Sequence, residues 1–402
     1  MSPVNDSNVP VSGQKVAKSM TLFSDPSFFV LLACAVAGAA ALGLTGHNLR
    51  HYGLAVTVTF LACAFFKTPE QLAALVAFLA ISRAALIWLA QGRESGRRYA
   101  VCLAATLAPL VIYKLSNVFG KDIWGFVGIS YITFKAVQML IEVRDGLISR
   151  EGLGLEDWLY FLLFFPQISS GPIDRSRRFA ADARTTPARD EYAGMLARGI
   201  LLLLAGALYK VVLATAIHRL YEPNAAGDAL YQLKTAYAYG LYLFFDFQGY
   251  SLMAMGASYC LGIRCPRNFR APFLAVDVID FWNRWHMTLS TWFRDFVFMR
   301  FTRWMMQRGW IKGRLRIANC AYLVDMLVMG FWHGVTLSYV AYGLYHGLLL
   351  AATQTVQKRS KFYRAHRRSA WFRACSWFVT QQLVFFGFAI FSGQVVMLCG
   401  LS

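Results

Sequence analysis

Charged residues are scarce in this sequence. Only 15% of its 402 residues are Asp, Glu, Lys or Arg, whereas a soluble globular domain carries about 25%. Hydrophobic residues make up 57%, and they gather in runs close to the roughly 20 residues that a helix needs to cross a bilayer. The shortage of charge therefore excludes an ordinary soluble fold and predicts a multi-pass membrane protein.

Acidic residues are the scarcer charged type, with 21 Asp and Glu against 40 Lys and Arg, and the net charge is +19. Nucleic-acid-binding proteins share such a balance. Here, however, the basic residues occupy short gaps between apolar runs, which is the positive-inside pattern of membrane proteins. The lipid bilayer, and no nucleic acid, is the partner that this charge predicts. The gaps expected on the cytoplasmic side are 93–98, 144–150, 175–189, 264–270, 300–316 and 358–373, which places the N-terminus outside.

Several sequence signatures are missing. The eight cysteines form no CxxC pair and have no histidine cluster beside them, so neither a disulfide framework nor a metal site is predicted. There is no GxSxG elbow, no P-loop and no dinucleotide-binding glycine fingerprint. The first residues also lack the order of charge, apolar stretch and cleavage site of a secretory signal peptide. Serine-hydrolase, nucleotide-dependent and metal-dependent chemistry thus have no support in the sequence.

The apolar runs predict an all-α fold, a polytopic membrane protein with about 10–11 transmembrane helices plus re-entrant and interfacial helices. Segment 158–173 is uncharged but short and broken by Pro166, Gly171 and Pro172, and we interpret it as a re-entrant dip. Residues 1–25 are expected to form a polar N-terminal tail, and 26–402 a single membrane domain. The predicted spans are 28–46, 52–66, 71–91, 99–119, 124–142, 191–217, 232–262, 318–335, 337–355 and 374–399.

Charges and tryptophans interleave between residues 276 and 296. Trp282, Trp285, Leu289, Trp292 and Phe296 follow helical steps of three or four and would form one stripe. Asp280 and Arg284 are four apart and can form an ion pair. The segment is either an interfacial amphipathic helix or a helix that lines a chamber inside the membrane.

Two histidines are candidates for chemistry inside the membrane, His286 in this segment and His333 within an apolar run. An imidazole can take up and return a proton near neutral pH, but a membrane histidine can also be purely structural. His346 would lie on a different face of a continuous helix, so we expect it to serve in packing or in a supporting role. Asp246, in an aromatic run, either orients a histidine or stabilises a kink at Gly249.

The same residues carry a family resemblance. The chain resembles the membrane-bound O-acyltransferases (MBOAT), and most closely the branch that transfers D-alanine to lipoteichoic acid. Four blocks occur in the expected order: Gly128-Ile129-Ser130-Tyr131-Ile132-Thr133-Phe134; Phe165-Pro166-Gln167 with Gly171-Pro172-Ile173-Asp174-Arg175; Phe245-Asp246-Phe247 through Phe281-Trp282-Asn283-Arg284-Trp285-His286; and Phe331-Trp332-His333-Gly334.

The resemblance implies helices around a central tunnel, with His333 as the catalytic general base and His286 as the second family histidine. The implied donor is an acyl group, D-alanyl, on the 4'-phosphopantetheine thioester of an acyl carrier protein, with no cofactor bound. The acceptor would be a hydroxyl of an envelope polymer or lipid-linked molecule, with small single-pass membrane proteins as further partners. This places the protein in a bacterial cytoplasmic membrane. The expected tunnel residues are Asn283, Trp282, Trp285, Trp332 and Asp246.

The basic segment 300–316 is expected to receive the carrier, since such carriers are acidic. It could equally be a positive-inside loop without a partner. The residues expected to dock the carrier are Arg300, Arg303, Trp304, Met305, Arg314 and Arg316.

Two other functions remain open from the sequence. O-acetyl transfer to a polysaccharide or to peptidoglycan would use the same family chemistry. A transporter would also contain a re-entrant dip and buried charges, although the two halves of the chain do not repeat a broken helix.

Overall fold

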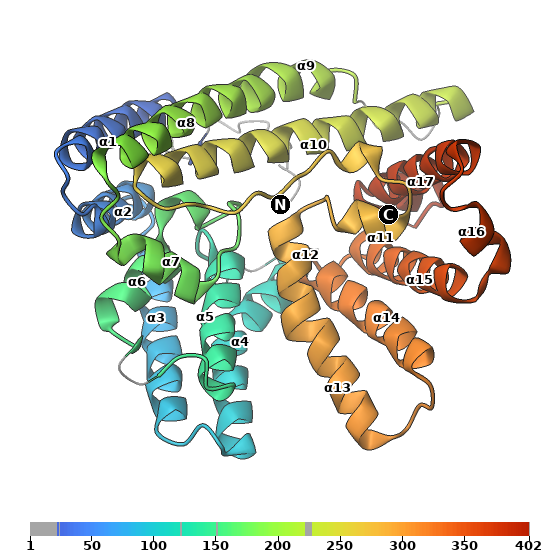
Figure 1. Cartoon of the computed structure of the whole chain (residues 1–402), viewed down its shortest axis with the longest axis horizontal. Helices are drawn as coiled ribbons and strands as arrows, with labels where there is room; N and C mark the ends of the chain where they lie inside the picture. The colour runs from blue at the N-terminus through green and yellow to red at the C-terminus, as the bar shows by residue number, and fades with distance from the viewer. Residues whose placement is uncertain (1–21, 24, 121–122, 150–151, 222–226, 402) are drawn as a thin grey trace. The chain divides into compact units, whose positions relative to one another are not determined.

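The computed structural model describes residues 22–401 except 24, 121–122, 150–151 and 222–226. All regular structure in this part of the chain is helical (Figure 1), so the all-α prediction is confirmed. The predicted polar tail lies almost wholly outside the described residues, and the first helix begins at Pro26. The described chain divides into two compact units.

The first unit runs to Gly206 and also includes Tyr250–Pro266. Its helices are α1 (Pro26–Leu44), α2 (Arg50–Phe65), α3 (Pro69–Ala90), α4 (Gly96–Val118), α5 (Ile129–Arg144), α6 (Leu155–Leu163), α7 (Ser176–Arg184), nearly all of α8 (Arg189–Ala207) and the last turns of α10 (Ala229–Cys260).

Polar residues and prolines set where several of these helices begin. The side chain of Asp25 accepts a hydrogen bond from the backbone of Ser27, and Pro26 occupies the first turn of α1. Ser95 accepts from the backbone of Arg98 at the start of α4. Such side chains satisfy backbone N–H groups that have no partner inside the helix, which matters most where little water is available.

The segment predicted as a re-entrant dip is broken, as its prolines and glycine indicate. After α6 the chain makes a short 3-10 turn, Phe165–Gln167, and then runs without regular structure to α7. Polar contacts hold it: the Nζ group of the buried Lys135 donates to the carbonyl of Phe161 at 2.9 Å, and the hydroxyls of Ser169 and Tyr250 lie 2.6 Å apart. Irregular backbone at membrane depth needs such partners. Its depth in the membrane stays a prediction.

The second unit contains Ala207–Gly249 and Arg267–Ser402. It starts with a π-helical stretch, η3 (Leu208–Ala214), and with α9 (Thr215–His218) and the first part of α10. Its other elements are η4 (Pro272–Leu274), α11 (Val278–Trp282), α12 (Met287–Phe293), the π-helical η5 (Arg294–Phe298), α13 (Met299–Arg308), α14 (Arg314–His333), α15 (Leu337–Arg359), α16 (Lys361–His366), α17 (Ala370–Phe391) and α18 (Gln394–Leu398).

Six helical segments are long and apolar enough to cross a membrane within the described residues. The other predicted spans, 52–66, 124–142, 232–262 and 337–355, fall on helices as well, namely α2, α5, α10 and α15. The protein is therefore a polytopic membrane protein. The six segments are Pro26–Leu44, Pro69–Ala90, Gly96–Val118, Arg189–His218, Arg314–His333 and Ala370–Phe391.

Candidate active site

His333 is the last residue of α14, at the turn into α15. Gly334 follows in an extended conformation, and its N–H donates to the carbonyl of Gly330 at 3.1 Å. The helices α14 and α15 then run side by side (Figure 1). The contact is close, because a Cβ at Gly343 would lie only 2.5 Å from the carbonyl oxygen of Met326. The helix end thus holds the imidazole at a fixed place.

Aromatic rings surround the His333 imidazole. Its ring centre lies 4.4 Å from that of Trp332, 4.8 Å from Phe391, 5.8 Å from Tyr339 and 6.3 Å from Tyr342. The residue is only partly buried, so a substrate can reach it. Aromatic walls exclude water around the ring and strengthen electrostatic interactions there.

His286 has a different setting. It occupies the turn between α11 and α12 with φ 42° and ψ 50°, a left-handed conformation that costs a residue with a Cβ about 1–3 kcal/mol. Its side chain is 4% exposed and lies against Phe247, with 4.6 Å between ring centres. Burial lowers the pKa of His286 to about 3, so the imidazole is neutral at physiological pH.

This turn corrects the helix predicted over 276–296. The chain forms two short helices, α11 and α12, with residues 283–286 between them. The predicted stripe therefore does not form one continuous face, because the left-handed backbone at His286 changes the direction of the chain. The predicted ion pair is present, with 2.7 Å between Arg284 Nε and Asp280 Oδ1.

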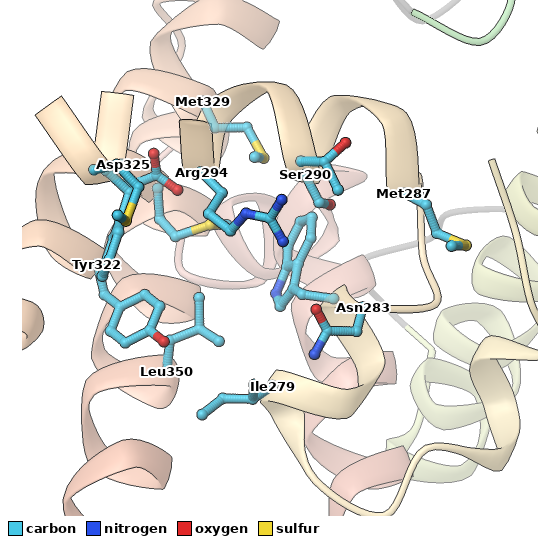
Figure 2. A pocket seen from close by; sticks show the side chains of 14 residues that line it. Ile279, Asn283, Met287, Ser290, Arg294, Tyr322, Asp325, Met329 and Leu350 are labelled. Carbon is cyan, nitrogen blue, oxygen red and sulfur yellow. The ribbon is translucent and has the colours of Figure 1, made fainter. Parts of the chain in front are cut away.

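A cavity of about 200 Å³ opens among α11, α12, η5, α14 and α15 (Figure 2). Asp325 and Tyr322 lie on one side and Ser290 and Met287 on the other, and the Arg294 side chain reaches between them. The lining residues are Ile279, Trp282, Asn283, Met287, Ser290, Thr291, Arg294, Phe298, Met299, Tyr322, Asp325, Met326, Met329 and Leu350.

The cavity lies close to His333 along α14. Met329, in its wall, precedes His333 by four residues, about 6 Å along the helix axis. A second link runs through Trp282, whose indole N–H donates to Nδ1 of His346 at 3.4 Å. The His346 ring packs on Tyr342 at 4.7 Å, and Tyr342 belongs to the aromatic surroundings of His333. His346 is fully buried, in keeping with the packing or supporting role expected for it.

The five residues expected to line a tunnel lie in different surroundings. Trp282 and Asn283 line the cavity, and Trp332 packs on His333. Trp285 lies instead within an aromatic cluster, 5.5 Å from Phe281 and 4.9 Å from Phe388 between ring centres.

Asp246 has a partner that the sequence does not reveal, and its place in a tunnel stays a prediction. Its carboxylate forms an ion pair with Lys210 of the π-helical stretch η3, and it is not among the residues that line the cavity. A partner 36 positions earlier in the chain cannot be seen from local spacing. The aspartate that does line the cavity is Asp325, which the sequence analysis missed. A carboxylate inside the apolar run 318–335 was the signal that could have found it.

The basic segment forms α13, a loop and the start of α14. Trp304 and Trp310 are 39% and 67% exposed, and the guanidinium of Arg308 lies about equally close to both indole rings, at 6.0 and 5.9 Å. Arg303, Arg314 and Arg316 are exposed, and Arg300 is partly buried. Met305 is only 4% exposed, so burial removes it from the predicted docking surface.

Known proteins are similar to this chain over most of its length. A model of MBOAT, the membrane-bound O-acyltransferase family, matches residues 144–402. The teichoic acid D-alanyltransferase of Bacillus subtilis is 39% identical over 395 residues, which cover 93% of this chain and 98% of that protein. The protein of the same name from Streptococcus thermophilus is 36% identical and covers 92% and 94%. A probable alginate O-acetylase of Pseudomonas syringae is 30% identical over 281 residues, 68% of this chain and 50% of that protein.

Proposed function

Because the chain belongs to the membrane-bound O-acyltransferase family, we propose that it moves a D-alanyl group from a carrier-protein thioester to a hydroxyl of a teichoic acid or similar envelope polymer. The observation that carries the proposal is His333, a partly exposed imidazole at a helix end inside an aromatic shell, one helical turn from a cavity. The names of the most similar relatives support the acyl group and the acceptor.

In the proposed reaction His333 acts as general base. It takes the proton of the acceptor hydroxyl while the hydroxyl oxygen attacks the thioester carbonyl carbon. The tetrahedral intermediate collapses, the carbon–sulfur bond breaks, and the imidazolium returns its proton to the departing thiolate sulfur. The products are an ester and a free phosphopantetheine thiol. Proton transfer of this kind contributes about 10²- to 10⁴-fold in rate.

The negative charge that develops on the carbonyl oxygen needs a hydrogen-bond donor. The side-chain amide of Asn283 is a donor in the cavity wall. His286 is neutral, and its Nε2 has no hydrogen-bond partner among the described residues, so in the tautomer protonated there it can donate. We assign the stabilising role to Asn283 and His286.

The carrier is proposed to dock on the basic segment 300–316, on the cytoplasmic side of the membrane, with the N-terminus outside. Exposed Arg303, Arg314 and Arg316 complement an acidic carrier, and Trp304 offers the apolar contact. With this orientation α14 leads from the docking surface at Arg314 to His333, so the acyl arm would travel along the cavity. Small single-pass proteins could then relay the product outside.

Thioester discharge tests the proposed base. Purified protein in nanodiscs is mixed with D-alanyl carrier protein and an acceptor, and loss of thioester is followed for wild type and His333→Ala. We expect at least a 100-fold slower discharge in the variant. His366→Ala, on α16 outside the cavity, is the matched control and should be as active as wild type. Normal activity of a folded His333→Ala protein would refute the assignment, and turnover of acetyl-CoA instead of the carrier would favour O-acetyl transfer.

Carrier binding tests the docking surface. Reversing two charges, Arg314→Glu with Arg316→Glu, should weaken the carrier affinity about tenfold, since exposed ion pairs each contribute about 1 kcal/mol or less. The loss should shrink at high salt. The control reverses Arg367 and Arg368, which changes the net charge equally on another basic segment. Equal carrier affinities for both double variants would show that segment 300–316 is a positive-inside loop without a partner.

A further inference from the structure

Asp325 is an acidic side chain in the middle of a predicted membrane span. It lies on α14 among apolar residues and is 8% exposed. A carboxylate at such a depth is costly and is retained where it has a partner or a ligand. For Asp246, the ion pair with Lys210 meets that need. Asp325, in contrast, takes part in no ion pair within the described residues.

The Asp325 carboxylate borders the cavity, and one of its oxygens is available. A backbone hydrogen bond from Phe298 holds the group in place, whereas Oδ1 has no hydrogen-bond partner within the described residues. Arg294 is the basic side chain in the cavity wall, and its guanidinium is engaged with Asp295 at 3.0 Å. The carboxyl group is thus held in place in the cavity wall, with one oxygen that has no partner (Figure 2).

We infer that Asp325 recognises the α-ammonium group of an aminoacyl thioester and selects it over an uncharged acyl group. The inference rests on the proposed function. Four methionines line the cavity with Ile279, Leu350 and Phe298, beside the polar Asn283, Ser290 and Thr291. A cation that enters this largely apolar space gives up part of its water, which strengthens its interaction with the unpaired carboxyl oxygen of Asp325. An acetyl or propionyl group carries no charge and gains nothing there.

The position of Asp325 fits selection during entry, before bond formation. It precedes His333 by eight residues, about 12 Å along α14. An ammonium is only two bonds from its own carbonyl carbon, so it cannot contact Asp325 while the carbonyl reacts at His333. With Arg314 on the docking side, an acyl arm meets Asp325 first and His333 afterwards. Asp325 is therefore a specificity-determining residue and not a catalytic one.

Two other uses of this carboxylate make a different prediction. It could accept an N–H of the phosphopantetheine arm, or it could serve to orient Arg294. Both would affect every loaded carrier equally, whatever the acyl group. Only recognition of the ammonium separates D-alanyl from propionyl, which is the same acyl group without the amino group.

Binding of two stable carriers separates these possibilities. The carrier's arm is joined through an amide, in place of the thioester, to D-alanyl or to propionyl, and Kd is measured for wild type, Asp325→Asn and the exposed control Asp190→Asn. We expect wild type and the control to prefer the D-alanyl carrier by about tenfold or more, as for hydrogen bonds to charged groups. Asp325→Asn should lose this preference by weakening D-alanyl binding alone.

The outcomes are distinguishable. A wild-type protein without preference, or an Asp325→Asn protein that binds both carriers equally weakly, overturns the inference while carrier-fed transfer stands. If neither carrier binds wild type, the proposed function itself fails. Unchanged propionyl binding by Asp325→Asn shows that the variant is folded.

Discussion

Replacing Gly343 by alanine should damage activity far more than stability. A Cβ there would lie 2.5 Å from the carbonyl oxygen of Met326 and 3.1 Å from Cα of Leu327, whereas non-bonded atoms pack at about 3.5 Å or more. Both neighbours are backbone atoms of α14 and cannot rotate away. The two helices must therefore separate by about 1 Å. Overpacking of this kind costs about 1–3 kcal/mol, of which alanine recovers about 0.5–1 kcal/mol through its better helix propensity.

The separation matters because His333 is on α14 and its aromatic neighbours Tyr339 and Tyr342 are on α15. A displacement of about 1 Å can cost about 100-fold in rate, so Gly343→Ala should lower thioester discharge between tenfold and 100-fold while Tm falls by a few degrees. Gly194→Ala is the control, because a Cβ at this helical position meets no atom within 4 Å. Activity within twofold of wild type and an unchanged Tm would show that the helices do not meet as described.

Two further predictions concern Lys210 and His286. Lys210→Leu should lower Tm, since it leaves the partly buried Asp246 carboxylate, 18% exposed, without its partner; the loss should stay below that of a fully buried pair, about 3–5 kcal/mol. Adding Asp246→Leu should restore most of the Tm, and a double variant as unstable as the single one would show that the pair has another role. His286→Ala should slow discharge by about 10²- to 10³-fold if His286 helps to stabilise the oxyanion. His286→Gly should discharge the thioester as slowly as His286→Ala but have a higher Tm, because glycine adopts the left-handed backbone without strain. Restored activity in His286→Gly would show that the role of His286 is purely structural.

The fold class could be predicted because each apolar run reports a local property. A run near 20 residues forms a helix in lipid whatever surrounds it, and the structure has helices at every predicted span. The break at 164–175 was also predictable, since proline and glycine act on their own backbone. Whether residues 26–402 act as one membrane domain stays a prediction.

The helix predicted through residues 276–296 shows where this reasoning fails. Aromatic spacing at three and four predicted one continuous stripe, but residues 283–286 interrupt it. The cause is tertiary: the N–H of Met287 donates to the carbonyl of Asn268 at 2.7 Å, and the N–H of Arg270 donates to the carbonyl of Arg284 at 3.0 Å. These contacts replace helical hydrogen bonds with bonds to a distant segment, which no periodicity reveals.

Asp246 and Asp325 show why the site is harder to predict than the fold. In the sequence both are single acids in apolar runs, and the rule that such residues face protein or a cavity applies equally to each. Their difference lies in what the fold brings to them, a lysine in one case and a cavity in the other. A paired carboxylate has its charge satisfied inside the protein, so losing it affects stability. The Asp325 carboxyl group in the cavity wall keeps one oxygen without a partner, so losing it should affect the choice of substrate. Asp246 thus has a partner within the protein, and the acid in the cavity wall, Asp325, is the one that sequence spacing did not single out.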